Sequence, residues 1–191
     1  RSEAALERLS AADALHRDAA EPGSRGNVLR AIGQVQYDLR RLEAAAASLR
    51  AAIALQADAP SEAAHSWLCL AQVERAAGRA DESQAALDAA LRLLEGSDAL
   101  DLTILADRER AAAALQRGDA RSAVDSMRRA FDRLREVEAG LSDAGMVGTE
   151  SHRDRSPLVD LALEAAFATR DPATIIEMLE RVRAHALRFA L

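Results

Sequence analysis

The sequence predicts an all-α protein built as an array of antiparallel helix pairs. Hydrophobic residues make up 49% of the 191 residues but aromatic residues only 3%. The core therefore has to be built mainly from Ala and Leu, which suits closely packed helices better than sheets. Apolar residues also recur at helical spacing between short breaks, which hold most of the 4 prolines and 9 glycines. We expect about nine helices, arranged as one half-pair followed by four pairs.

The first expected helix spans residues 2–20 and is the second helix of a pair whose first helix is missing. A break at Glu21 to Ser24 follows, and the first full helix pair is expected at 26–57. Small residues in this pair let the helices approach, and larger apolar residues fill the space between them. These core positions are Leu29, Ile32, Gly33, Ala45, Leu49 and Ala52.

The second pair is expected at 64–94, with a turn at Gly78 and with Trp67 as the largest buried side chain. A third pair is expected at 100–137, and its turn at Gly118-Asp119 places Ala123, Met127 and Ala130 in the core. Its first helix departs from the pattern, because Asp107 and Arg110 stand where large apolar residues belong. We expect that helix to be rotated or shifted.

Residues 139–156 form the one long irregular segment that the pattern predicts. A connection of this length is typical of a mobile insertion, which we favour, or of a loop that contacts a partner. The last pair is expected at 156–191, with Pro157 in the first turn. Apolar residues continue to Leu191, and the chain starts at Arg1 without Met. We therefore interpret 1–191 as one domain from a larger protein that covers its C-terminal end.

The pair at 64–94 resembles the tetratricopeptide repeat, or TPR. The residues that carry the resemblance are Trp67, Leu70, Ala71, Gly78, Leu87 and Ala90. It extends over nearly the whole chain and implies a TPR-like α-solenoid. It also implies a non-catalytic scaffold that binds a peptide or protein segment in its concave groove.

A second, shorter resemblance narrows this expectation. Residues 180–188, ERVRAHALR, are similar to a helix that closes the repeat region ahead of a CHAT domain, the caspase-like peptidase domain of bacterial regulatory proteins. The resemblance implies that the chain is the sensor or regulatory arm of a larger protein. The peptidase would follow Leu191 and contact the last helix, so no catalytic residue is expected in this segment.

The TPR resemblance also supplies candidate partner-binding residues. In that family the first helix of each pair lines the groove, with repeat positions 2, 5, 9, 12 and 13 pointing into it. The matching residues that we select are Asn27, Arg30, Gln34, Tyr37, Asp38, His65, Gln72, Arg75 and Arg108. The same registers also place Leu68, Asp160, Glu164 and Phe167 on this face. For any one of them, an ordinary polar helix face is the alternative interpretation.

Composition argues against several other classes of function. The net charge of −6 gives no electrostatic footprint for nucleic acid or an anionic membrane, and no apolar run is long enough to span a bilayer. The single Cys excludes an internal disulfide, so we expect a cytoplasmic protein. His65 and Cys69 share a helix face, but two potential ligands do not make a metal site, and we interpret Cys69 as a small core residue. No metal, cofactor or catalytic motif is expected.

Two alternatives to the groove-binding scaffold stay open. One is a structural module that self-associates through its exposed end helices. The other is the helical repeat arm of a transcriptional regulator or a signalling ATPase. The sequence leaves the oligomeric state and the identity of the partner undetermined.

Overall fold

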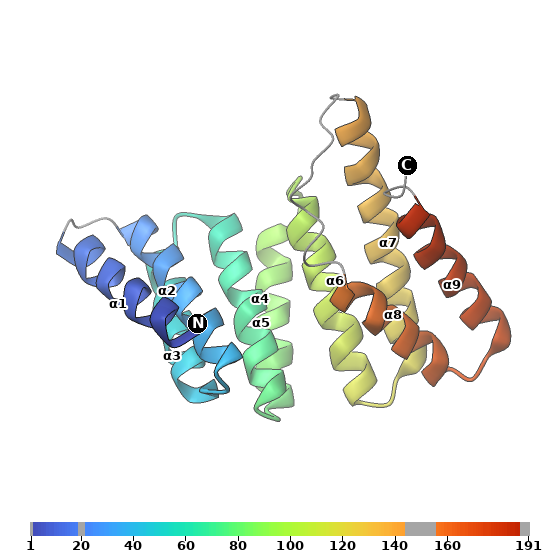
Figure 1. Ribbon diagram of the computed structural model, residues 1–191, viewed down its shortest axis with the longest axis horizontal. Coiled ribbons are helices and arrows are strands. Elements are labelled where there is room, and N and C mark those ends of the chain that lie inside the picture. The colour runs from blue at the N-terminus through green and yellow to red at the C-terminus, as the bar shows by residue number, and fades with distance from the viewer. Residues whose placement is uncertain (1, 19–21, 144–155, 188–191) are drawn as a thin grey trace. The chain divides into compact units, whose positions relative to one another are not determined.

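The computed structural model describes residues 2–18, 22–143 and 156–187 (Figure 1). Nine α-helices and no strand occur in these ranges, which confirms the predicted all-α fold. The helices are α1 (Ser2–Asp18), α2 (Pro22–Asp38), α3 (Leu42–Leu55), α4 (Pro60–Ala76), α5 (Ala80–Leu94), α6 (Leu100–Gln116), α7 (Ala120–Asp143), α8 (Ser156–Ala168) and α9 (Pro172–Leu187). None of the helices in this part of the chain is long and apolar enough to span a membrane.

Contacts between the helices divide the chain into two compact units, residues 1–102 and 103–191. In the first unit each helix from α1 to α5 packs against the next one, and α2 also contacts α4. In the second unit α7 packs against α8 and α8 against α9. The interpretation of 1–191 as one domain stays a prediction.

Two helices begin earlier than the sequence predicted. Helix α2 starts at Pro22 and α4 at Pro60, whereas we placed the starts of these pairs at 26 and 64. A proline has no N–H and its φ is already near the helical value, so it fits the first turn of a helix. Residues 22–24, which we interpreted as part of a break, therefore form the first turn of α2, and α4 gains one turn ahead of its predicted start. Since both starts move by the same amount, the spacing between the pairs is unchanged.

The first unit is built on close helix contacts through small residues. Ala45, Leu49 and Ala52 on α3 are fully buried, as predicted. A Cβ placed on Gly33 of α2 would lie 2.7 Å from Leu49 Cγ and 3.2 Å from the carbonyl oxygen of Ala45. Helices α2 and α3 therefore approach so closely that only glycine fits at Gly33.

Helix α4 corrects the prediction for Trp67. This helix contacts α2, α3 and α5, so that residues on most of its circumference are buried, including Leu68 and Cys69. Trp67 is only partly buried. The prediction that Trp67 is the largest buried side chain is wrong, and Leu68, which we placed on the groove, lies in the core.

The second unit has its own core, shared by α6, α7, α8 and α9. The predicted positions Ala123, Met127 and Ala130 are fully buried in it, together with Met178 of α9. Helix α7 continues to Asp143, so residues 139–143 of the predicted irregular segment are helical. Ala and Leu in this stretch favour a helix, and one glycine costs only about 1 kcal/mol. Residues 144–155 lie outside the described residues.

Asp107 shows how α6 accommodates its departure from the repeat pattern. Its side chain is buried, and its carboxylate contacts three guanidinium groups. Arg129 Nε lies 3.1 Å and Arg110 Nη1 3.5 Å from Oδ1, and Arg133 Nη1 contacts Oδ2. Helix α6 keeps Asp107 buried, and α7 supplies charges that compensate its carboxylate. The expected rotation or shift of this helix stays a prediction.

Candidate functional site

Eight of the nine selected groove residues lie in the first unit, on α2 and α4, which contact each other. We call their surface the α2–α4 face. Asn27, Gln34 and Asp38 are exposed, and the other five are partly buried, namely Arg30, Tyr37, His65, Gln72 and Arg75. Gln72 follows His65 by two helical turns and Arg75 follows by about one more. The three therefore run along α4 over about 15 Å.

Gln56, a buried residue that we did not predict from the sequence, stabilises one end of this face. Gln56 follows α3 and donates through Nε2 to Asn27 Oδ1 at 3.1 Å, while its Oε1 accepts from Ser66 Oγ at 2.7 Å. A Cβ on Gly26 would lie 2.7 Å from Gln56 Cγ, so glycine is needed for this approach. Gln56 thus links α2 to α4 and fixes Asn27. No sequence motif marks this role.

The middle of the face is held by Cys69 of α4. Its thiol donates to Gln34 Oε1 at 3.3 Å, and the side chain is otherwise buried, as expected for a small core residue. Among the described residues, no three His, Cys, Asp or Glu side chains are grouped as metal ligands would be. The pairing with Gln34 gives Cys69 a structural role at this position.

Arg30 and His65 form the most unusual part of the face. Burial and, to a smaller extent, the nearby Arg30 guanidinium together lower the pKa of His65 to about 4, although the Asp101 carboxylate acts in the opposite direction. His65 is therefore neutral at pH 7. Arg30 donates through Nη2 to Asn27 Oδ1 at 3.3 Å, but its Nε is buried and has no hydrogen-bond partner in the described ranges. A buried donor without a partner is unfavourable, so an incoming acceptor would be stabilised there.

The ninth selected residue, Arg108, lies in the second unit. It donates to Glu109 Oε1 at 3.0 Å, and that carboxylate is buried. The further positions Asp160, Glu164 and Phe167 lie exposed on α8, also in the second unit.

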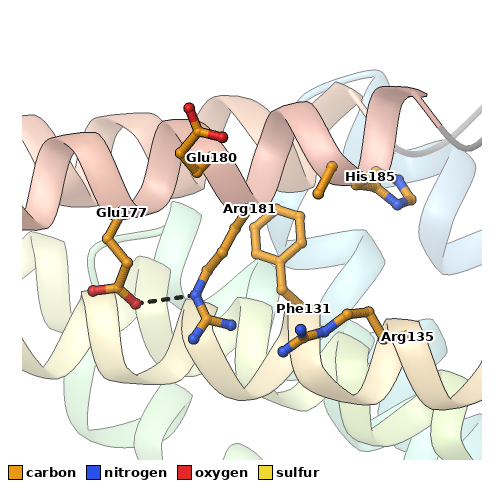
Figure 2. A pocket seen from close by; sticks show the side chains of 7 residues that line it. Phe131, Arg135, Glu177, Glu180, Arg181 and His185 are labelled. Atoms are coloured by element: carbon orange, nitrogen blue, oxygen red, sulfur yellow. Dashed lines mark hydrogen bonds and ion pairs between the residues drawn. The ribbon is translucent and has the colours of Figure 1, made fainter.

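A pocket of about 390 Å³ opens between α7 and α9 in the second unit (Figure 2). Its lining residues are Phe131, Arg135, Glu177, Glu180, Arg181, Ala184 and His185. The sequence singled out residues 180–188 only for their resemblance to a known helix and did not predict the pocket. Phe131, Arg135 and Glu177 were missed, because nothing in the local sequence shows which residues of α7 and α9 face each other.

Ion pairs between α7 and α9 shape one wall of this pocket. Arg128 of α7 contacts Glu177 of α9 through both Nε, at 3.0 Å, and Nη2, at 2.5 Å. Arg181 donates through Nε to Glu177 at 3.0 Å and through Nη1 to Asp132 at 2.7 Å. The hydrogen bond from Arg128 lowers the pKa of Glu177, which keeps the carboxylate ionised. Such bidentate pairs fix both helices relative to each other.

Comparisons with known proteins identify the type of fold. No protein-family model matches the chain, and no curated protein matches it. Solved structures do match. The nearly identical TPR-like repeats of a kinesin light chain-like protein from Podosopora anserina align with a TM-score of 0.64 at 18% identity, over 98% of this chain and 88% of that one. A single-residue variant of those repeats aligns with a TM-score of 0.65 at 19% identity, over 96% of this chain and 85% of that one.

BtubC (BKLC) from P. vanneervenii aligns with a TM-score of 0.69 at 14% identity, over 96% of this chain and 74% of that one. At identities this low, the matches show a shared fold, but they do not show that this chain shares the activity of the matched proteins. Together with the nine helices of the described ranges, these likenesses confirm the sequence-based prediction of helix pairs. The chain has a TPR-like helical-repeat fold.

Proposed function

We propose that the first unit is a non-catalytic interaction module that binds a peptide or protein segment along the α2–α4 face. The observation that carries the proposal is the buried Nε of Arg30, which has no hydrogen-bond partner among the described residues. A carboxylate or a main-chain carbonyl of a bound segment would satisfy this donor. TPR-like folds serve in general as protein-interaction scaffolds, which is consistent with this role.

The surroundings of Arg30 are suited to an extended chain. Gln34 and Gln72 carry both donors and acceptors, which main-chain amides of a segment require. His65 is neutral, because its pKa is lowered to about 4, and so adds no charge beside Arg30. Because Gln56 and Cys69 hold Asn27 and Gln34 in place, the face needs little ordering on binding.

A peptide library displayed against the 191-residue chain tests the proposal. We expect selected peptides to contain an acidic side chain, and Arg30→Gln to raise their Kd at least tenfold. Arg92→Gln is the matched control, since Arg92 is exposed in the last turn of α5 and lies outside the α2–α4 face. A library that yields no binder, or binders with equal Kd for Arg30→Gln and the control, would contradict the proposal.

We further propose that this module is the regulatory arm of a larger protein, with a CHAT-type peptidase as the domain that follows. The support is the resemblance carried by residues 180–188, most of which lie in α9. Binding at the α2–α4 face would then control the following domain. The residues encoded after Leu191 decide the matter, because a caspase-like domain with its His and Cys either follows or does not.

Exposed apolar residues favour a second function, self-association. Phe167 of α8 and Ile176 and Leu179 of α9 are all exposed in the second unit. Sedimentation over a range of concentrations distinguishes the two functions. Self-association requires an oligomer that dissociates when Ile176 is replaced by Asp, whereas the interaction module needs no oligomer.

A further inference from the structure

The pocket between α7 and α9 has an aromatic floor. The ring of Phe131 meets that of His185 edge to face, with centroids 6.1 Å apart and planes inclined at 68°. Both side chains are buried, and only small parts of them reach the surface. Ala184 also lines the pocket, and its short side chain fills little of the space. Figure 2 shows Phe131 and His185 in this pocket. A flat apolar group would fit against this floor.

The carboxylates around the floor are already engaged. Glu177 accepts from Arg128 and Arg181, and Asp132 accepts from Arg181 and Arg135. Glu180 contacts Arg183 Nη2 at 2.8 Å and points away from Phe131 in Figure 2. The carboxylates near the pocket are thus paired with guanidinium groups of the protein.

The guanidinium groups of Arg135 and Arg181, in contrast, have N–H donors that form no hydrogen bond to the described residues. Arg181 uses Nε and Nη1, and Arg135 uses Nη2, so that Arg181 Nη2 and Arg135 Nε and Nη1 make no hydrogen bond within the described part of the chain. Figure 2 shows both guanidinium groups beside the ring of Phe131. The side chain of Arg135 is 56% exposed and can reorient toward a ligand. The pocket therefore has guanidinium donors available for a ligand, whereas its carboxylates are already paired.

We propose that this pocket binds a small aromatic carboxylate. Its ring packs on Phe131 and Ala184, and its carboxylate accepts hydrogen bonds from Arg135 and Arg181, a geometry for which the planar guanidinium is well suited. A volume of about 390 Å³ accommodates a ligand of one or two rings. The site lies in the second unit and is independent of the segment binding proposed for the α2–α4 face.

Titration of the ¹⁵N-labelled 191-residue chain with indole-3-propionate, followed by NMR, tests this site. We expect shift changes confined to residues 131–135 of α7 and 177–185 of α9. Arg135→Gln should raise the Kd at least tenfold. The control is Arg183→Gln, because the Arg183 side chain, 68% exposed against 56% for Arg135, does not line the pocket; it should leave the Kd within twofold of the original.

Two further measurements make the result decisive. Ala184→Phe fills the pocket without disturbing the core, since Ala184 is exposed, and should abolish the shift changes. Tryptamine carries the same ring with a cationic group and should bind at least tenfold more weakly. Absence of binding, shift changes elsewhere, unchanged affinity in either pocket variant, or equal binding of tryptamine would each overturn the proposal.

Discussion

Both units bury a carboxylate on the first helix of a pair, but they compensate it differently. Glu74 of α4 contacts Arg50 Nη2 of α3 at 2.5 Å and Arg79 in the turn after α4, so its charge ties one helix pair to the next. Asp107 of α6 is held only by arginines of α6 and α7, within its own pair, as far as the described residues go. The same buried charge can therefore join neighbouring pairs or close a single pair.

Removing the Asp107 carboxylate, which links α6 to α7, should have the largest effect on the free energy of unfolding. Asp107→Ala leaves Arg110, Arg129 and Arg133 close together without their shared partner. Breaking a buried ion pair from one side typically costs about 3 to 5 kcal/mol. We expect that decrease in the free energy of unfolding, measured by urea denaturation followed by circular dichroism. A decrease below about 1 kcal/mol would show that the cluster is not needed for stability.

Removing the charge of Glu74, which links the two helix pairs of the first unit, should lower the free energy of unfolding by a smaller amount. Glu74→Gln keeps the shape and some hydrogen bonds to Arg50 and Arg79, and we expect a loss of about 2 to 3 kcal/mol. The control is Glu43→Gln, because Glu43 also contacts Arg79, at 2.6 Å, but is largely exposed. Exposed pairs contribute less than about 1 kcal/mol. Equal losses in the two variants would contradict the role assigned to the buried carboxylate.

The close approach of α2 and α3 gives a third test, limited to the first unit. Gly33→Ala forces Leu49 and the backbone of Ala45 to move, which should lower the free energy of unfolding by about 2 kcal/mol. Gly23→Ala on the same helix meets no atom within 4 Å. It should be neutral or stabilising, by up to about 1 kcal/mol, since alanine favours the helix. Denaturation of both variants side by side separates packing from helix propensity.

His65 predicts a pH dependence that belongs to the first unit. Its pKa is about 4 in the folded chain, below the ordinary value of 6.5. Between these values the unfolded chain binds a proton that the folded chain does not, so stability falls as the pH drops from about 6.5 to 4. Allowing for solvent screening of this partly buried side chain, we expect a loss of about 1 to 2 kcal/mol. His65→Gln should remove this part of the pH dependence in denaturation measured at about pH 7 and about pH 4.5.

The smallest expected effect on stability concerns a type of turn that occurs in both units. Arg40 lies in the turn after α2 with φ of 60°, and Arg170 lies in the turn after α8 with φ of 55°. Gly78 and Gly118 occupy the corresponding positions in the other two pairs. Side chains are disfavoured in this left-handed region, and glycine is not. Arg40→Gly and Arg170→Gly should each stabilise the chain by about 0.5 to 1 kcal/mol, seen as a higher melting temperature. A lower melting temperature would show that these arginines make contacts worth more than the strain.

The regular core positions could be read from the sequence, because the alternation of small and large residues directly reflects helix contacts. Ala45, Leu49, Met127 and Ala130 are buried as predicted. The exposure of Trp67 could not be predicted in this way. It depends on how far the neighbours of α4 extend around that helix, which no local pattern contains.

Polar contacts between different helices were the feature that we could predict least well from the sequence. Asp107 was recognised as a departure from the pattern, but its compensation by Arg129 and Arg133 depends on how α7 lies against α6. Gln56 and the pocket around Phe131 were missed for the same reason, since each is assembled from separate helices. The residues of the α2–α4 face were named from the family resemblance, and their role in binding stays a prediction.

The partial exposure of Trp67 has an optical consequence. It is the only tryptophan in the chain and lies in α4, on the helix that carries His65, Gln72 and Arg75. Its fluorescence is therefore a built-in signal from the first unit, free of any contribution by tryptophan in the second. Because its indole is only partly buried, the emission wavelength and its quenching respond to changes in the surroundings of α4. A segment that binds the α2–α4 face can thus be followed without attaching a label.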